Sequence, residues 1–151
     1  MSQETGTNTN NQLTVNSDTS KIFIGDNRHD NFAYAKDNSA GTDDITIPAG
    51  TLFGRISATG YVIPLESGAS DGSQFPIGIL REDKTILYGE DYDDEITLCV
   101  EGRVARAKVI FQGSDTMATV VSSRRLDDRI GSDTVGIKLV ASTELTGYDN
   151  D

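Results

Sequence analysis

Residues 45–80 read ITIPAGTLFGRISATGYVIPLESGASDGSQFPIGIL. Short apolar runs, at residues 45–47, 52–56, 61–65 and 77–80, alternate with turns rich in Gly, Pro, Ser and Asp. Runs of this length bounded by such residues are typical of β-strands joined by tight turns. This stretch therefore predicts an all-β fold.

The same pattern extends to both sides of this stretch. Further strands are predicted at residues 22–24, 94–100, 103–111, 118–121 and 135–140, with Gly102 among the residues that separate them. Only residues 124–130 look helical, capped by Ser122 and Ser123 and ended by Gly131. We expect a mainly β domain over residues 21–151, a small β-barrel or sandwich with one short helix.

Residues 1–20 differ in composition from the rest of the chain. Their only apolar side chains are Met1, Leu13 and Val15, which is too few to offset the entropy cost of ordering. We expect a disordered N-terminal arm, which is either a binding segment or a solubilising tail. Within it, Leu13-Thr14-Val15 has the period of a strand and could add to the sheet edge of another chain.

The charge balance excludes several classes of partner. The chain of 151 residues has 24 acidic and 13 basic residues and a net charge of −11, which opposes binding to nucleic acid or to anionic membranes. No apolar run approaches the length of a membrane span, and the N-terminus does not look like a signal peptide. We expect no nucleic acid and no membrane partner, and a chain that begins here and is made in a cytosol.

The residues that carry most catalysis and metal binding are scarce. Cys99 and His29 are the single cysteine and histidine; we interpret the first as a buried thiol and the second as a solvated loop residue. The run from Asp91 to Asp94 lacks the spacing of a calcium loop, so we expect an exposed acidic hairpin loop. We predict no enzyme activity, cofactor or metal.

Charge is also uneven along the chain. Residues 82–95 contain seven acidic residues and one basic residue, whereas residues 103–129 contain six basic and three acidic residues. Opposite charges suit head-to-tail contacts between copies, although two solvated faces would explain them equally well. The candidate inter-subunit charges are Asp91, Asp93, Asp94, Arg103, Arg106, Arg124 and Arg125.

One loop carries a specific turn signal. Asp71-Gly72 predicts a tight turn with Gly72 at positive φ and with Asp71 bonded to the backbone two residues on. Gly78 lies in the following strand, in the run Ile77-Gly78-Ile79-Leu80. We therefore assign Asp71, Gly72 and Gly78 structural roles.

Together these segments resemble the lambda-type head decoration proteins of tailed bacteriophages. The resemblance rests on residues 50–56 (GTLFGRI), 59–61 (TGY), 69–74 (ASDGSQ) and 77–80 (IGIL), then on 101–104 (EGRV), and on the order of the predicted helix and closing strand. It covers roughly residues 48–140. Residues 21–44 exceed what a minimal member needs, and could be an added strand or a second docking surface.

The resemblance implies a structural protein of the virion. It implies a homotrimer on the outer surface of an icosahedral head, where it cements the major capsid protein lattice after expansion, with the N-terminal arm ordering on the capsid. The alternative is a trimeric phage fibre or carbohydrate-binding β module, which would show exposed aromatic side chains on one face.

Overall fold

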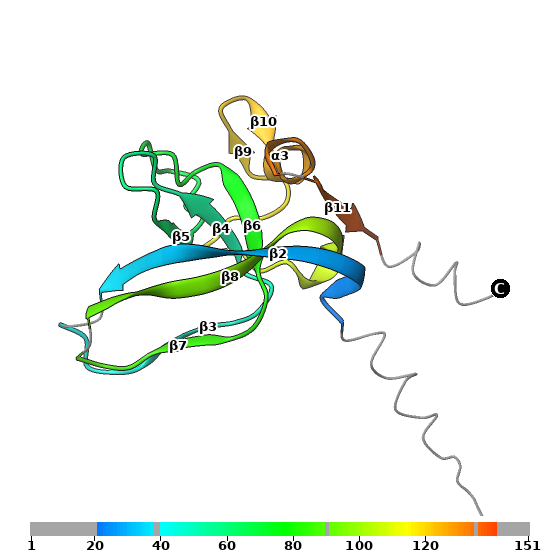
Figure 1. Ribbon diagram of the computed structural model, residues 1–151. Coiled ribbons are helices and arrows are strands. Elements are labelled where there is room, and N and C mark those ends of the chain that lie inside the picture. Colours follow the sequence, from blue (N-terminus) through cyan, green and yellow to red (C-terminus); the bar gives the residue numbers. More distant parts are fainter. Residues whose placement is uncertain (1–20, 38–39, 90, 135, 142–151) are drawn as a thin grey trace, which may run out of the picture.

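The computed structural model describes residues 21–37, 40–89, 91–134 and 136–141 (Figure 1). Two long strands dominate, and the remaining elements are short. In chain order the strands are β2 (Phe23–Asp37), β3 (Ile45–Ile47), β4 (Leu52–Arg55), β5 (Val62–Pro64), β6 (Pro76–Leu80), β7 (Lys84–Ile86), β8 (Asp91–Ala105), β9 (Val120–Val121), β10 (Arg124–Arg125) and β11 (Gly136–Val140). A 3₁₀ turn (Arg106–Lys108) follows β8, and helix α3 (Leu126–Asp133) precedes β11.

Five of these strands close into a small barrel. The pairing runs from β8 through β2, β5 and β4 to β6, and β6 pairs again with β8. The closing contacts are Ile79 opposite Cys99 and Leu80 opposite Leu98, while β2 meets β5 at the single pair Tyr34 and Val62. The predicted mainly β architecture with one short helix is confirmed.

Alternating side chains supply two cores, one on each side of the barrel wall. The first contains one or more residues from each barrel strand, with Tyr34 against Phe53 edge to face at 5.9 Å. The second fills the space between the wall, β11 and α3, where Leu126 and Ile130 are fully buried. Because neighbouring residues of a strand point to opposite faces, Phe53 serves the first core and Leu52 the second.

Strands β2 and β8 form one long antiparallel ribbon, which corrects three predictions. The strand predicted at residues 22–24 does not end there; the chain bulges between Ile24 and Arg28, and β2 continues. Gly102 does not separate two strands, since β8 runs through it at φ +129°. Residues 91–94 are not a loop, because they pair with β2 in the order Asp37, Lys36, Ala35 and Tyr34. Cross-strand pairing outweighs the local turn propensity of these residues.

The helix also departs from its predicted limits. Ser122 and Ser123 do not cap it; they form the turn between β9 and β10 at φ +48° and +71°. The residue at the N-cap is Arg125, without a side-chain cap bond, and the helix continues past Gly131 to Asp133. Packing of Leu126 and Ile130 on the barrel thus determines the helix, rather than its end signals.

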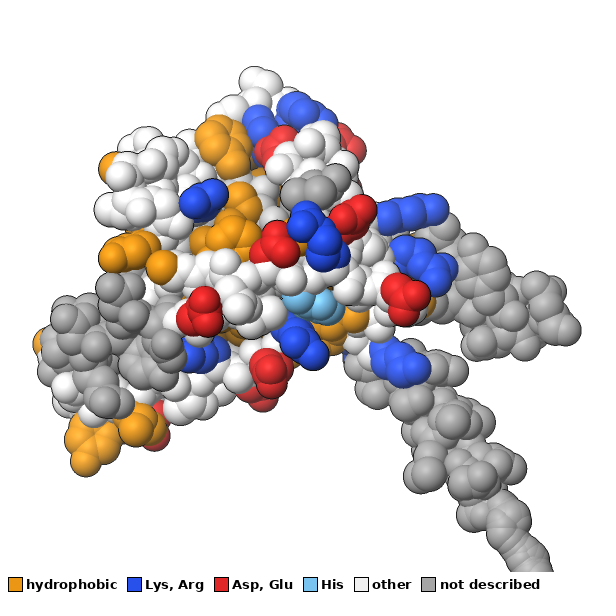
Figure 2. Space-filling model, viewed as in Figure 1, with side chains coloured by type: hydrophobic (Ala, Val, Ile, Leu, Met, Phe, Trp, Pro, Cys, Tyr) orange, Lys and Arg blue, Asp and Glu red, His pale blue; other side chains and the backbone are white. Residues whose placement is uncertain are grey.

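The remaining elements lie outside the barrel. Strands β3 and β7 pair with one another, with Ile45 opposite Ile86. The sequence pattern predicts β3 but not β7, because β7 lies within the acidic segment of residues 82–95. The apolar side chains Leu87 (51% exposed) and Tyr88 (65%) follow β7, and Figure 2 shows hydrophobic side chains at this tip. Among the described residues, no helix is long and apolar enough to cross a membrane.

Candidate functional site

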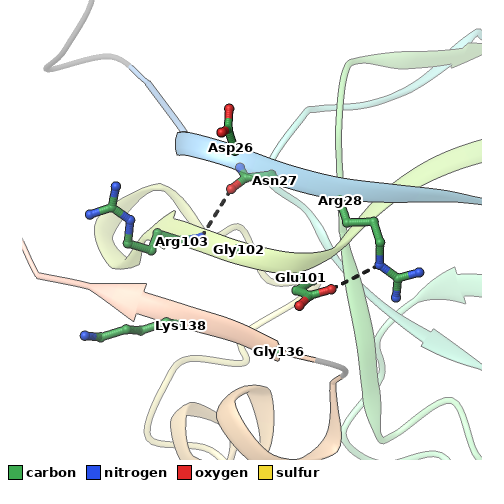
Figure 3. A pocket seen from close by; sticks show the side chains of 8 residues that line it. All are labelled: Asp26, Asn27, Arg28, Glu101, Gly102, Arg103, Gly136 and Lys138. Carbon is green, nitrogen blue, oxygen red and sulfur yellow. Dashed lines mark hydrogen bonds and ion pairs between the residues drawn. The ribbon is translucent and has the colours of Figure 1, made fainter.

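The bulge of the β2–β8 ribbon opens a pocket of about 560 Å³. We call it the bulge pocket; it is lined by residues 26–28 of β2, residues 101–103 of β8, and Gly136 and Lys138 of β11 (Figure 3). Three of these side chains are cationic and two are anionic. The pocket therefore has a net positive charge on a chain whose net charge is −11.

The cations of the bulge pocket fall into two groups. Arg28 is neutralised, because it pairs with Glu101 at 3.1 Å and with Asp30 at 3.3 Å. Arg103 and Lys138 lie opposite one another on β8 and β11, are both exposed, and have no acidic side chain within ion-pair distance among the described residues. In Figure 3 their side chains extend in the same direction, away from the Arg28–Glu101 pair. Two adjacent like charges favour an anion between them.

A glycine and an amide hold the pocket open. Asn27 Oδ1 accepts a hydrogen bond from the Arg103 backbone N–H at 3.2 Å. A Cβ at position 102 would collide with Asn27 Oδ1, so Gly102 is required twice, for its positive φ and for this close approach. The bulge is therefore a constructed feature of the fold rather than a local irregularity.

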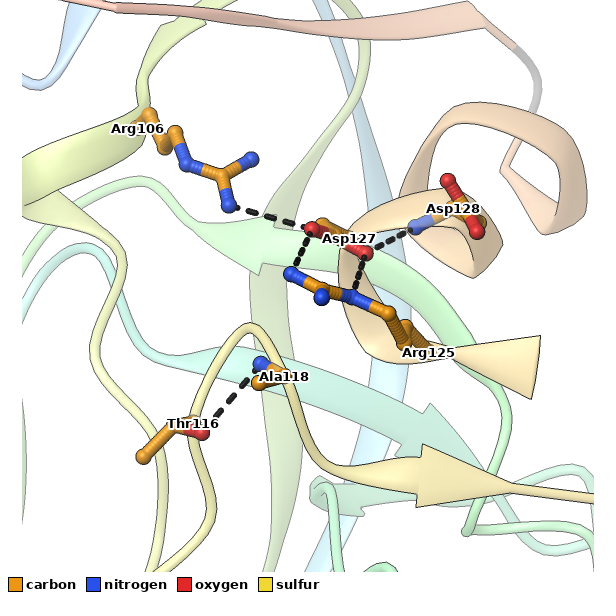
Figure 4. A network of polar contacts seen from close by, with 6 residues as sticks. All are labelled: Arg106, Thr116, Ala118, Arg125, Asp127 and Asp128. Carbon is orange, nitrogen blue, oxygen red and sulfur yellow. Dashed lines mark hydrogen bonds and ion pairs between the residues drawn. The ribbon is translucent and has the colours of Figure 1, made fainter.

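Two of the predicted inter-subunit arginines are already paired within the chain. Asp127, at the start of α3, binds Arg125 at 2.8 Å and Arg106 at 3.1 Å (Figure 4). The hydrogen bond from Arg125 is the largest cause that lowers the pKa of Asp127 to about 2. This network ties α3 to the 3₁₀ turn after β8, so Arg106 and Arg125 have a structural role in the isolated chain.

Neutralising this network should reduce stability in a pH-dependent way. We expect Asp127→Asn to lower the free energy of unfolding by about 1 kcal/mol at neutral pH, after allowance for solvent screening. The folded pKa is below the ordinary 3.8, so the contribution is complete above that value and is lost as pH falls towards the folded pKa. Denaturant unfolding of both proteins from pH 7 down to acid should show the difference shrinking.

The matched control is Asp128→Asn, which changes the same charge one residue further along α3. Its side chain is exposed and lies outside the ion pairs of Asp127. An equal loss of stability in both variants, or a difference independent of pH, would contradict the assigned role of Asp127.

The other predicted charges are dispersed. Arg124 is exposed on β10, opposite Val121. Asp91, Asp93 and Asp94 lie at the beginning of β8, at the far end of the ribbon from Arg103 (Figure 1). The structure therefore places the acidic candidates and Arg103 at opposite ends of β8, and the other basic candidates lie on other elements.

The Asp71–Gly72 turn is built as the sequence suggests. Asp71 Oδ1 accepts hydrogen bonds from Ser73 N at 3.0 Å and Ser73 Oγ at 2.6 Å, which lower the pKa of Asp71. Gly72 has φ +105°. Gly78 is buried in β6, where a Cβ would lie 2.9 Å from both Cys99 O and Leu98 Cβ. Asp71 and Gly72 thus form the turn before β6, and Gly78 lets β6 lie close to β8.

Gly72→Val should destabilise the fold by at least about 1 kcal/mol, because valine is strained at positive φ. An added Cβ would also lie 2.8 Å from Arg55 O. Gly68→Val is the control, since nothing lies within 4 Å of a Cβ there. Thermal unfolding should separate the two variants; equal melting temperatures would contradict this role of Gly72.

His29 is not the solvated loop residue that was predicted. It lies in β2 directly opposite Cys99, packs edge-on against Phe23 at 5.5 Å, and its Nε2 is buried without a hydrogen-bond partner. Burial lowers the pKa of His29 and raises the pKa of the Cys99 thiol, so both side chains favour the neutral state. This is the opposite of the thiolate and imidazolium pair that nucleophilic cysteines use.

Sequence reasoning missed Lys138 and Arg28. Arg28 stands in a polar run that was interpreted as a loop, and Lys138 becomes a neighbour of Arg103 only through the parallel pairing of β11 with β8. The predicted arm residues Leu13, Thr14 and Val15 lie outside the described residues. The described part of the chain contains no group of three or more metal-ligating side chains.

The fold is thus a small β-barrel, and the bulge pocket, which has a net positive charge, lies at one end of its two longest strands. No known family model matches the sequence, and no curated protein matches it.

Proposed function

We propose that this protein is a capsid decoration protein: a homotrimer that binds the outer surface of a tailed-phage head and stabilises the expanded lattice of the major capsid protein. Its role is structural, without catalysis or cofactor. Its place is the virion, after synthesis in the host cytoplasm.

The observation that carries the proposal is where the resembling residues lie in the fold. Residues 50–80 build β4, β5, the Asp71–Gly72 turn and β6, which is one continuous part of the barrel. Gly102 in β8, helix α3 and β11 then follow in the order of the resemblance. That the resembling segments lie together in one barrel and its covering elements supports the proposal.

The exposed side chains favour attachment to a protein surface over carbohydrate binding. Large exposed apolar side chains in the described residues are Leu87, Tyr88, Ile110 and Val120, among which Tyr88 is the one aromatic. A carbohydrate platform requires several aromatic faces on one surface. Charged side chains and a polar arm suit attachment to a protein lattice, where three linked contacts bind far more tightly than one.

Co-sedimentation with expanded, undecorated capsids tests the proposal. We expect saturable binding with threefold stoichiometry and higher resistance of the decorated shells to heat. Unexpanded shells and a glycan array are the comparisons. Failure to bind expanded shells, or binding to glycans instead, would overturn the proposal.

A further inference from the structure

The two ends of the β2–β8 ribbon carry net charges of opposite sign. At one end Asp91, Asp93 and Asp94 of β8 lie beside Asp37 of β2, with Lys36 as the neighbouring cation. We call these four aspartates the acidic end. At the other end Arg103 of β8 lies beside Lys138 of β11 in the bulge pocket. The acidic end therefore has a net negative charge, and the bulge pocket has a net positive charge.

The two ends cannot meet within one chain. Asp93 and Arg103 lie on the same continuous strand, ten residues apart, which corresponds to about 33 Å of extended backbone. The ribbon spans the body of the protein from one side to the other (Figure 1). Any neutralisation of the acidic end by Arg103 and Lys138 must therefore occur between molecules.

The bulge pocket is prepared for such a partner. Arg28 is engaged by Glu101 and Asp30, whereas the exposed Arg103 and Lys138 have no described acidic partner. The other basic candidates are less suited: Arg106 and Arg125 are held by Asp127, and Arg124 stands on the separate β9–β10 hairpin. Among the candidate inter-subunit cations, Arg103 is thus the one that has a second cation beside it and no described acidic partner.

We propose that the acidic end of one copy docks in the bulge pocket of the next copy, with Arg103 and Lys138 as the receiving cations. Such a contact is heterologous, so it closes a ring when the rotation per copy allows. The inference rests on the proposed trimer and specifies which surfaces form it. In this arrangement each copy inserts its acidic end into one neighbour and accepts the acidic end of the other neighbour in its bulge pocket.

Charge reversal at each end tests the pairing. Arg103→Glu with Lys138→Glu should convert the assembly to monomers, with the dissociation constant raised at least about 30-fold. Asp91→Lys with Asp93→Lys should do the same from the other end; these two positions share one face of β8, whereas Asp94 pairs with the fully buried Tyr34. Combining all four substitutions in one chain restores opposite charges at the contact, so the trimer should form again. Sedimentation velocity at low ionic strength, where screening is weakest, measures each case.

The control is Lys108→Glu with Arg124→Glu, which changes the net charge equally at two exposed sites outside both ends. This variant should assemble like the parent. A parent that stays monomeric at low ionic strength, an unaffected trimer in either double variant, or no recovery in the fourfold variant would overturn the inference. Circular dichroism verifies that each variant is folded.

Capsid binding separates this inference from the proposed function. A parent that decorates expanded shells while the Arg103→Glu, Lys138→Glu variant still forms trimers would overturn the inference and leave decoration standing. A protein that forms charge-reversible trimers but binds no shell would retain the inference and overturn decoration.

Discussion

Deletion of residues 2–20 is expected to abolish capsid decoration while leaving the melting temperature of the body nearly unchanged. The deleted segment contains two apolar side chains, Leu13 and Val15, so it has little to contribute to a core. The described strand pairings of the barrel begin at Phe23. Co-sedimentation with expanded shells and thermal unfolding measure the two effects on the same protein.

Single prolines localise the effect within the arm. Val15→Pro removes a backbone donor from the Leu13–Val15 stretch and should disturb strand addition to a capsid strand. Asn10→Pro places the same residue outside that stretch and should bind like the parent. If the truncated protein decorates shells with parental affinity, docking belongs to the body.

Arg129→Met is expected to destabilise the fold by about 2–4 kcal/mol, more than any surface change considered above. Arg129 is only 9% exposed. Its guanidinium donates to Val121 O at 2.7 Å and Ser122 O at 3.1 Å, pairs with Asp133 at 2.8 Å, and lies 4.8 Å from the centre of the Phe75 ring. Methionine keeps the apolar stem but leaves these acceptors without the cation.

Two comparisons make this test specific. Arg124→Met changes the same side chain at an exposed site nearby and should cost little. Arg129→Lys keeps the charge but cannot reproduce the planar fork, so its stability should be intermediate. A parental melting temperature for Arg129→Met would show that the arginine does not hold the β9–β10 hairpin on α3.

The site could be predicted only in part because its charges come from distant segments. The sequence indicated acidic and basic regions, and Arg103 does line the bulge pocket. Its neighbour Lys138 is 35 residues away along the chain, and parallel pairing of β11 with β8 brings them together. Arg106 and Arg125 were candidates for a partner, but Asp127 occupies both. Contacts between residues that are distant in the sequence therefore decide which charges remain unpaired and can bind a partner, and a local sequence pattern does not show such contacts.

The sequence by itself determined the β class, most strand positions between residues 45 and 80, and the tight turn at Asp71–Gly72. Each of these follows from local alternation and from residues suited to positive φ. Only the tertiary structure decided that β2 and β8 continue through glycines that look like breaks, and that five strands close into a barrel. The physical reason is that pairing and burial across the barrel outweigh the small local preferences that a turn signal represents.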